Sequence, residues 1–171
     1  MKEKLEETLK SEQNFLKTLV KWTVLSALVG SVVGVIASGF AHVISLVTEF
    51  RIGHPFMILG LPLGGMLVVY LYKLGGQEKN SGTNMVLDTV RTPKGEMPSV
   101  IAPLILIATT VTHMFGGSSG REGAALQFGA SVGSFFGRTL KLNESDRKII
   151  ILSGMSAAFA ALFGTPMAAA I

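Results

Sequence analysis

The stretch FGGSSGREGAALQFG, residues 115–129, decides how the rest of this chain is interpreted. It follows one apolar run and leads into another, and it places Arg121 and Glu122 side by side in a glycine-rich break. Charged side chains at membrane depth are energetically expensive, and where they occur they usually mark a functional site. We therefore expect this break to carry the function of the protein.

The composition is typical of a protein with several membrane-spanning helices. Of its 171 residues, 49% are hydrophobic and only 15% are charged, whereas a soluble domain carries about a quarter charged residues. A helix that crosses a bilayer needs about 20 apolar residues. The sequence therefore predicts an all-α, polytopic membrane protein. Of the runs without Lys, Arg, Asp or Glu, 22–48, 52–72, 97–120 and 149–171 reach this length, and 123–137 is shorter.

The placement of basic residues predicts the orientation. Lys17 and Lys21 flank the first apolar run on its N-terminal side, and further basic residues lie within 73–96. By the positive-inside rule, the N-terminus and residues 73–96 are cytoplasmic, which predicts a multi-pass protein of the cell (plasma) membrane. The mixed-charge residues 1–15 are expected to form a cytoplasmic amphipathic helix, and they do not resemble a signal peptide.

Proline, glycine and capping residues predict the helix boundaries. The short segment SGTNMVLDTV is expected to hold a helix of about two turns, with Ser81 or Thr83 as its N-cap and Asp88 early in it. The other expected helices lie at about 3–14, 16–48, 56–72, 98–114 and 122–137, followed by a span with Glu144 and Asp146 in its first turn, a break at Gly164 and a restart at Pro166.

Two of the expected helices carry small residues at every fourth position. This spacing lets helix backbones approach closely in lipid. We interpret it as packing within the chain, with a subunit interface as the alternative. The stripes are Gly30, Gly34 and Ser38 in the first span, and Ala125, Gly129, Gly133 and Gly137 after the break.

The sequence ends at Ile171, inside an apolar helix and without a polar stop signal. A helix that ended within the bilayer would leave backbone carbonyls without partners. We therefore expect the chain to be a fragment of a longer protein, and a short terminal helix is the alternative.

Glycine-rich breaks interrupt the apolar segments at three places. They are SGTNM before Val86, GGSSGREG before Ala124 and FGTP before Met167. Helix N-termini carry unpaired N–H groups and a partial positive charge, and within a bilayer such ends are tolerated only inside protein or beside a watery cavity. Because converging broken helices are typical of transport sites, the breaks predict re-entrant helices that bind an anion.

Glu122 stands at the start of the helix after the longest break, where its carboxylate would itself occupy an anion site. By taking up a proton or by swinging away, it would yield that place to an anion and couple the two movements. A structural carboxylate paired with Arg121 is the alternative. A GxxxxGK[ST] phosphate loop is disfavoured, because Arg121 and Glu122 stand where that loop requires lysine and Ser or Thr.

No catalytic or metal-binding pattern accompanies the breaks. His42, His54 and His113 are isolated from carboxylates at ligand spacing, and the chain contains no cysteine. His113, just before the break, is a candidate vestibule residue, and the basic connection 138–148 is interpreted as an interfacial anchor and only weakly as an anion funnel. We expect no enzyme, no metal, no cofactor and no nucleic-acid partner.

The segment GGSSGREGAALQFGASVG resembles the GREGP segment of the CLC chloride channels and proton-coupled antiporters. SGTNMVLDTV falls where that family carries its GSGIP segment, and AAFAALFGTPMAAAI resembles the helix break that follows the gating loop. Order and spacing agree from about residue 20 to the end. The resemblance implies that residues 16–171 are a partial CLC-type transmembrane domain, the first of the family's two inverted halves.

The resemblance assigns roles by position. Glu122 matches the gating and proton-coupling glutamate. Ala124 replaces the proline after GREG, and the filter serine is not clearly present; both departures resemble the fluoride-exporting branch of the family. The positions that match anion-binding loops are Gly120, Arg121 and Gly123, together with Ser81, Gly82, Thr83, Asn84 and Met85 of the filter segment.

The resemblance implies transport of a small halide anion, chloride or fluoride, coupled to proton counter-transport through Glu122. A passive chloride channel of the voltage-gated type is one alternative, and a non-transporting membrane assembly subunit is another. The partners implied are the halide ion, the proton, the lipid bilayer and, for the full-length protein, a second copy in a homodimer.

Overall fold

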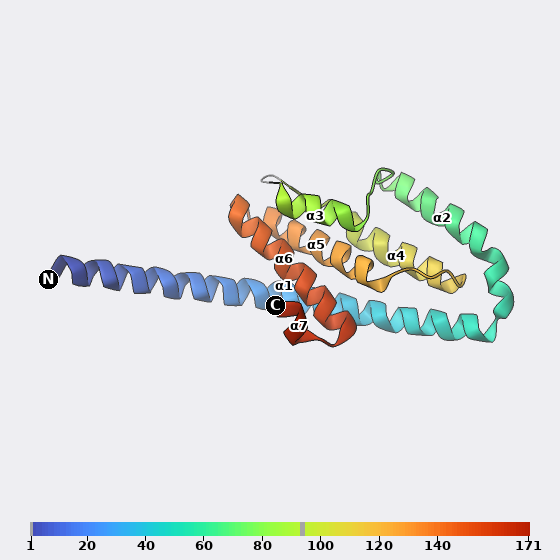
Figure 1. The fold of residues 1–171 in the computed structure, drawn as a ribbon, viewed down its shortest axis with the longest axis horizontal. Coiled ribbons are helices and arrows are strands. Elements are labelled where there is room, and N and C mark those ends of the chain that lie inside the picture. Colours follow the sequence, from blue (N-terminus) through green and yellow to red (C-terminus); the bar gives the residue numbers. More distant parts are fainter. Residues whose placement is uncertain (1, 93–94) are drawn as a thin grey trace.

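The computed structural model describes residues 2–92 and 95–171, and within these ranges the chain is helical without a strand (Figure 1). The all-α prediction is therefore confirmed. The elements in chain order are α1 (Lys2–Gly53), the 3-10 helix η1 (Pro55–Gly60), α2 (Leu61–Leu74), α3 (Thr83–Arg91), α4 (Ile101–Met114), α5 (Arg121–Thr139), α6 (Glu144–Phe163) and α7 (Pro166–Ala170).

The first helix differs from its prediction. α1 runs without interruption through residues 15 and 16, so the separate head helix and long helix are one helix. Residues 11–21 contain neither glycine nor proline, and nothing local ends a helix there. The amphipathic face expected for residues 1–15 falls largely on side chains outside the described residues, as does Lys94 of the predicted cytoplasmic loop.

Two helices in the described part of the chain are long and apolar enough to cross a membrane, at Glu12–Gly53 and Pro55–Leu74. The span expected at 98–114 is shorter than predicted, because α4 begins only at Ile101. Its 14 residues extend about 21 Å, less than the roughly 30 Å of a hydrocarbon core. α4 therefore does not cross a bilayer by itself.

α5 is the central helix of the bundle. It packs against α6, α4, α3 and α1 (Figure 1), and most of its residues from Ala124 to Gly137 are buried. Helices that are buried all round need neighbours on every side. α5, whose start carries the GREG motif, is thus held in place by four other helices.

The closest packing in the fold joins α5 to α6. A Cβ placed on Gly133 would lie 2.6 Å from the carbonyl oxygen of Ile150, and one on Gly129 or Gly154 would overlap the carbonyl oxygen of the other residue. The predicted small-residue packing is therefore confirmed for the α5 stripe. On α1 it is not: a Cβ on Gly30 or Gly34 would meet nothing within 4 Å among the described residues.

Side chains of α5 also hold the segment that leads into α4. Ser131 Oγ donates to the carbonyl of Pro98 (2.7 Å) and accepts from the N–H of Ala102 (3.2 Å). Ser134 Oγ accepts from the N–H of Met97 (3.1 Å). α4 has no side-chain cap of its own, and Ser131 takes the place of one at the N–H of Ala102. Ser134 holds the segment that precedes the helix.

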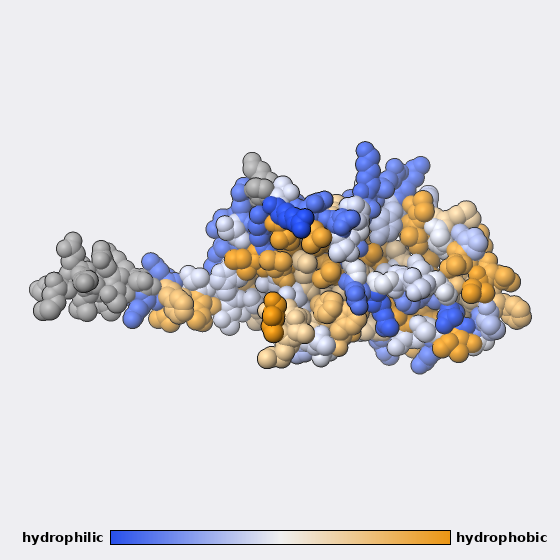
Figure 2. Space-filling view, in the orientation of Figure 1, coloured by the Kyte–Doolittle hydropathy of each residue, from blue (hydrophilic) through white to orange (hydrophobic). Residues whose placement is uncertain are grey.

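The surface of the two long apolar helices is itself apolar. Side chains such as Val24, Val35, Leu63 and Val69 are well exposed, and Gly64 is the one buried residue of α2. Figure 2 shows broad apolar areas on this face, with hydrophilic side chains along the upper edge near the α2–α3 connection. Exposed apolar surface of this extent is what lipid or another membrane-embedded surface covers.

Gly133→Ala is expected to destabilise the full-length gene product by about 1–3 kcal/mol, since the added methyl group would press on the backbone of α6. Gly65→Ala in α2 is the matched control, because a Cβ there meets nothing within 4 Å among the described residues. That control should change stability by no more than about 1 kcal/mol. Thermal unfolding of the two variants in detergent measures the difference, and equal midpoints would contradict the close α5–α6 contact.

Candidate functional site

The break after α4 is fixed by backbone hydrogen bonds and by one aromatic ring. The N–H of Gly116 donates to the carbonyl of His113 (3.0 Å) and that of Gly117 to Thr112 (2.8 Å), with Gly116 at φ 84°. The ring of Phe115 lies so close to η1 that a Cβ on Gly60 would be 2.6 Å from it. Glycine therefore suits both Gly116, with its positive φ, and Gly60, beside the ring of Phe115. The chain turns sharply at the end of α4.

α5 then begins without a side-chain cap. Gly120 is its N-cap, and Glu122 lies in its first turn. The N–H groups of this turn have no partner within the helix and carry the partial positive charge of its N-terminus. Backbone donors are therefore available at this helix start, where the GREG motif predicts an anion site.

α3 begins in a comparable way, but its cap differs from the prediction. The N-cap is Gly82 at φ 65°, ψ −131°, and neither Ser81 nor Thr83 caps the helix. Asp88 lies in the second half of α3, so its expected place early in the helix is also wrong. A backbone with this φ is readily adopted only by glycine, which explains why the cap falls there.

Asn80 holds this turn, and the sequence interpretation did not single it out. Its side-chain Oδ1 accepts from the N–H of Gly82 at 2.7 Å. Asparagine two residues before such a donor is the usual signal of an Asx turn, so the pattern NSG could have identified it.

The structure brings the starts of α3 and α5 together. A Cβ on Gly123 would lie 3.3 Å from Thr83 Oγ1, and the two helices pack against each other. The third predicted break, before α7, does not take part in this contact, because α7 packs against α6. Two of the three predicted helix starts are therefore neighbours.

The two charged side chains of the break do not pair with each other in the structure. Arg121 and Glu122 are both exposed, and no ion pair joins them among the described residues. The capping pair considered as an alternative is thus not formed. Of the other candidate positions, Gly82, Thr83, Met85 and Gly123 are partly buried, and Ser81, Asn84 and Gly120 are exposed.

Gln127 lies one turn after Gly123 and is buried. Its Nε2 donates to the carbonyl of Gly123 at 3.3 Å. Its Oε1 is buried without a hydrogen-bond partner among the described residues. This side chain supports the first turn of α5 from within the helix.

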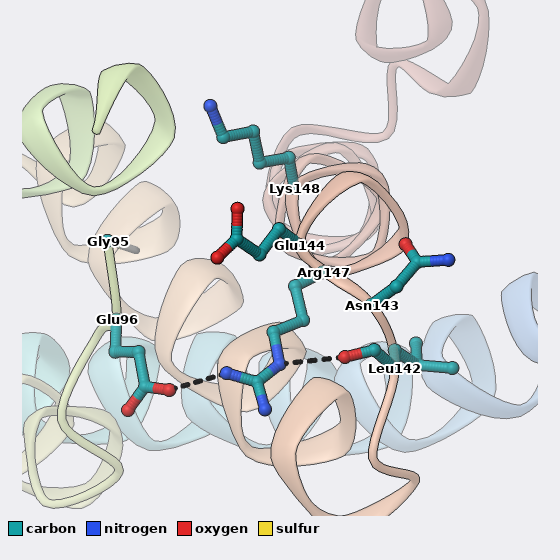
Figure 3. A pocket seen from close by; sticks show the side chains of 7 residues that line it. All are labelled: Gly95, Glu96, Leu142, Asn143, Glu144, Arg147 and Lys148. Atoms are coloured by element: carbon teal, nitrogen blue, oxygen red, sulfur yellow. Dashed lines mark hydrogen bonds and ion pairs between the residues drawn. The ribbon is translucent and has the colours of Figure 1, made fainter. Parts of the chain in front are cut away.

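A different polar hollow, of about 330 Å³, lies at the far end of α5 (Figure 3). Glu96 pairs there with Arg147 (2.6 Å) and with Arg138 (3.6 Å), and Arg147 also donates to the carbonyl of Leu142 (3.0 Å). Two cations of the basic connection interpreted from sequence, Arg138 and Arg147, thus share the single carboxylate of Glu96. This is better suited to fastening the α3–α4 connection to α5 and α6 than to attracting anions.

No cluster of three potential metal ligands occurs in the described part of the chain. His113 donates a hydrogen bond through Nδ1 to the carbonyl of Thr109 at 2.9 Å. It also lines a small hollow beside the break, together with Arg51.

Comparisons with known proteins agree on one family. The sequence matches the family described as "Voltage gated chloride channel" over residues 64–171. A "Chloride/fluoride channel protein" of Pseudomonas syringae pv. tomato is 36% identical over 158 residues, which are 92% of this chain and 35% of that protein. An uncharacterized protein of Methanocaldococcus jannaschii is 30% identical over 157 residues, 90% of this chain and 37% of that protein.

A solved structure has a similar fold. The crystal structure of a CLC-type fluoride/proton antiporter matches with a TM-score of 0.81 and 34% identity, over 88% of this chain and 38% of that chain. The chain therefore spans between 35% and 38% of the length of these relatives.

Gly82→Ala is expected to destabilise the full-length gene product by about 1–3 kcal/mol, because a side chain does not tolerate the backbone angles at the start of α3. Gly53→Ala, at a position with ordinary φ and no neighbour within 4 Å among the described residues, is the control. The thermal midpoints of the two variants measure the effect. A Gly82 variant as stable as the Gly53 variant would show that the α3 start is not constrained in this way.

Proposed function

The chain belongs to the family of voltage gated chloride channels, and on this premise we propose that the full-length protein transports a small halide anion, chloride or fluoride, across the cell membrane. We propose further that transport is coupled to proton counter-transport through Glu122. Members of this family are channels and transporters, so we do not assign an enzymatic activity.

The observation that carries the proposal is the meeting of two uncapped helix starts. α3 and α5 approach each other at Thr83 and Gly123, and neither helix has a side-chain cap. Two sets of backbone donors with partial positive charge then face one region, which favours a small anion. Glu122, in the first turn of α5, carries the carboxylate that would compete for the same region.

We assign anion contacts to the two loops that meet there. In the α5 loop these are Gly120, Arg121 and Gly123. In the filter segment they are Ser81, Gly82, Thr83, Asn84 and Met85. Ala124, after the GREG motif, favours fluoride as the substrate by the resemblance stated above.

The remaining assignments follow from the positive charges and from the family. We propose that the N-terminus is cytoplasmic, that residues 1–15 form a helix at the membrane surface, and that residues 16–171 are part of a CLC-type transmembrane domain. We also propose that the full-length protein is a homodimer in the lipid bilayer. The apolar exposed surface of α1 and α2 supports the membrane assignment.

Glu122→Gln is expected to abolish proton movement driven by an anion gradient while altering the rate of anion flux, because the amide cannot take up and release a proton. The full-length protein in liposomes is measured with a halide electrode and a pH-sensitive dye, for chloride and for fluoride. Glu144→Gln is the matched control, since Glu144 is another exposed glutamate in the first turn of a helix, α6, away from the α3–α5 contact.

The outcomes separate the alternatives. Unchanged coupling in the Glu122 variant would contradict the role given to this residue. Anion flux without proton movement in the unmodified protein would identify a passive channel. No flux of either halide would contradict transport itself and would favour an assembly subunit.

A further inference from the structure

α3 carries one of the two helix starts of the proposed anion site, yet little of this helix is buried. Val86 and Thr89 are the buried residues among its nine, and the helix packs against α5 and α6. A helix of this length extends about 14 Å, so a shift at its C-terminal end also displaces its start beside Gly123. Whatever holds the later part of α3 therefore acts on the proposed site.

The segment that follows α3 lies directly against the helix. A Cβ on Gly95 would overlap the carbonyl oxygen of Thr89. Met97 has no exposed surface and packs in one apolar cluster with Val86, and its Sδ lies 4.0 Å from Thr89 Oγ1. Both buried residues of α3 thus contact this segment, and the position of Met97 decides where α3 lies.

The backbone of Met97 is held in turn by two side chains of α5. Its N–H donates to Ser134 Oγ (3.1 Å), and its carbonyl accepts from Arg138 Nη1 (3.1 Å). Arg138 also donates through Nη1 to Ser134 Oγ (3.3 Å) and through Nη2 to Ser99 Oγ. Its ion pair with Glu96 (3.6 Å) balances the charge. One guanidinium thus fastens residues 96, 97 and 99 to the end of α5.

The place of Arg138 in the last turn of α5 suits any cation, because a positive charge there offsets the partial negative charge of the helix end. A lysine would have this effect as well. The directed bonds to Met97 and Ser99 require more, since only the planar fork of arginine presents several N–H donors in fixed directions. Charge and directed bonding are therefore separable at this residue.

We propose that Arg138 is a positioning residue of the anion site. By fixing the backbone of Met97, it sets where the start of α3 lies against Gly123, and with it the affinity for the anion. The anion site itself rests on the proposed function. Groups that bind a small ligand have to be held within about 0.5 Å of the productive geometry, and α3, with two buried residues of its own, depends on Met97 for this.

Arg138→Lys removes the fork and keeps the charge. In liposomes containing the full-length protein, KM for the transported halide is expected to rise by roughly three- to tenfold, because the start of α3 is no longer fixed against that of α5. Arg147→Lys is the matched control, since Arg147 pairs with the same Glu96 but donates to the carbonyl of Leu142. It should leave KM unchanged. An unchanged KM in Arg138→Lys would overturn the proposal and leave the charge at the helix end as the role of this residue.

Ser134→Ala removes the second bond to the backbone of Met97. KM is expected to rise in this variant too. Because both side chains act through Met97, the double variant with Arg138→Lys should raise KM by less than the product of the two single effects. Single effects that multiply in full would contradict an action through Met97.

Hydrogen exchange tests the position of α3 without any transport. In the full-length protein, exchange of the backbone amides of residues 83–91 is expected to become faster in Arg138→Lys and to stay unchanged in Arg147→Lys. Equally faster exchange in α6 would indicate a general loss of stability and would overturn the positioning role. Absence of flux in the unmodified protein would contradict the proposed function. Faster exchange confined to α3 would then still support the positioning of this helix by Arg138, and unchanged exchange would overturn it.

Discussion

The backbone contact between α5 and α6 is the constraint on which the rest of this structure depends. Gly129, Gly133 and Gly154 let the two helices approach until backbone meets backbone. In lipid, apolar side chains gain little by facing one another, so close van der Waals packing and hydrogen bonds decide which helices associate. The contact fixes α5 in the centre of the bundle, and every element near the candidate site is positioned against α5.

The polar side chains of α5 extend this constraint to the break. Ser131 and Ser134 hold residues 97–102, and Arg138 donates to the carbonyl of Met97 at 3.1 Å. With its start held, α4 ends at Met114, and Phe115 then packs against η1. The loop that begins α5 therefore starts from an element that α5 itself positions. Such closed sets of contacts keep a functional loop in place without a cap of its own.

Local chemistry explains which features the sequence predicts. The starts at Arg121 and Pro166 and the stop at Gly164 follow from glycine and proline, whose backbone preferences act within one or two residues. The close packing of the small residues on α5 was also predictable, because their fourfold spacing can be seen in the sequence itself. The open face of Gly30 and Gly34 was not predictable, because the same residues suit several arrangements and only distant neighbours choose between them. Arg51 and His113 lie far apart in sequence, and their shared pocket exists only in the fold.

The exposure of Glu122 determines how strongly the start of α5 can stabilise a negative charge. An exposed helix N-terminus stabilises a negative charge by about 0.3–1 kcal/mol, and salt screens even this. The same donors act several times more strongly once water is excluded, because the effective dielectric constant falls. α3 and α5 therefore supply the direction of the field, whereas its strength depends on whatever covers their starts.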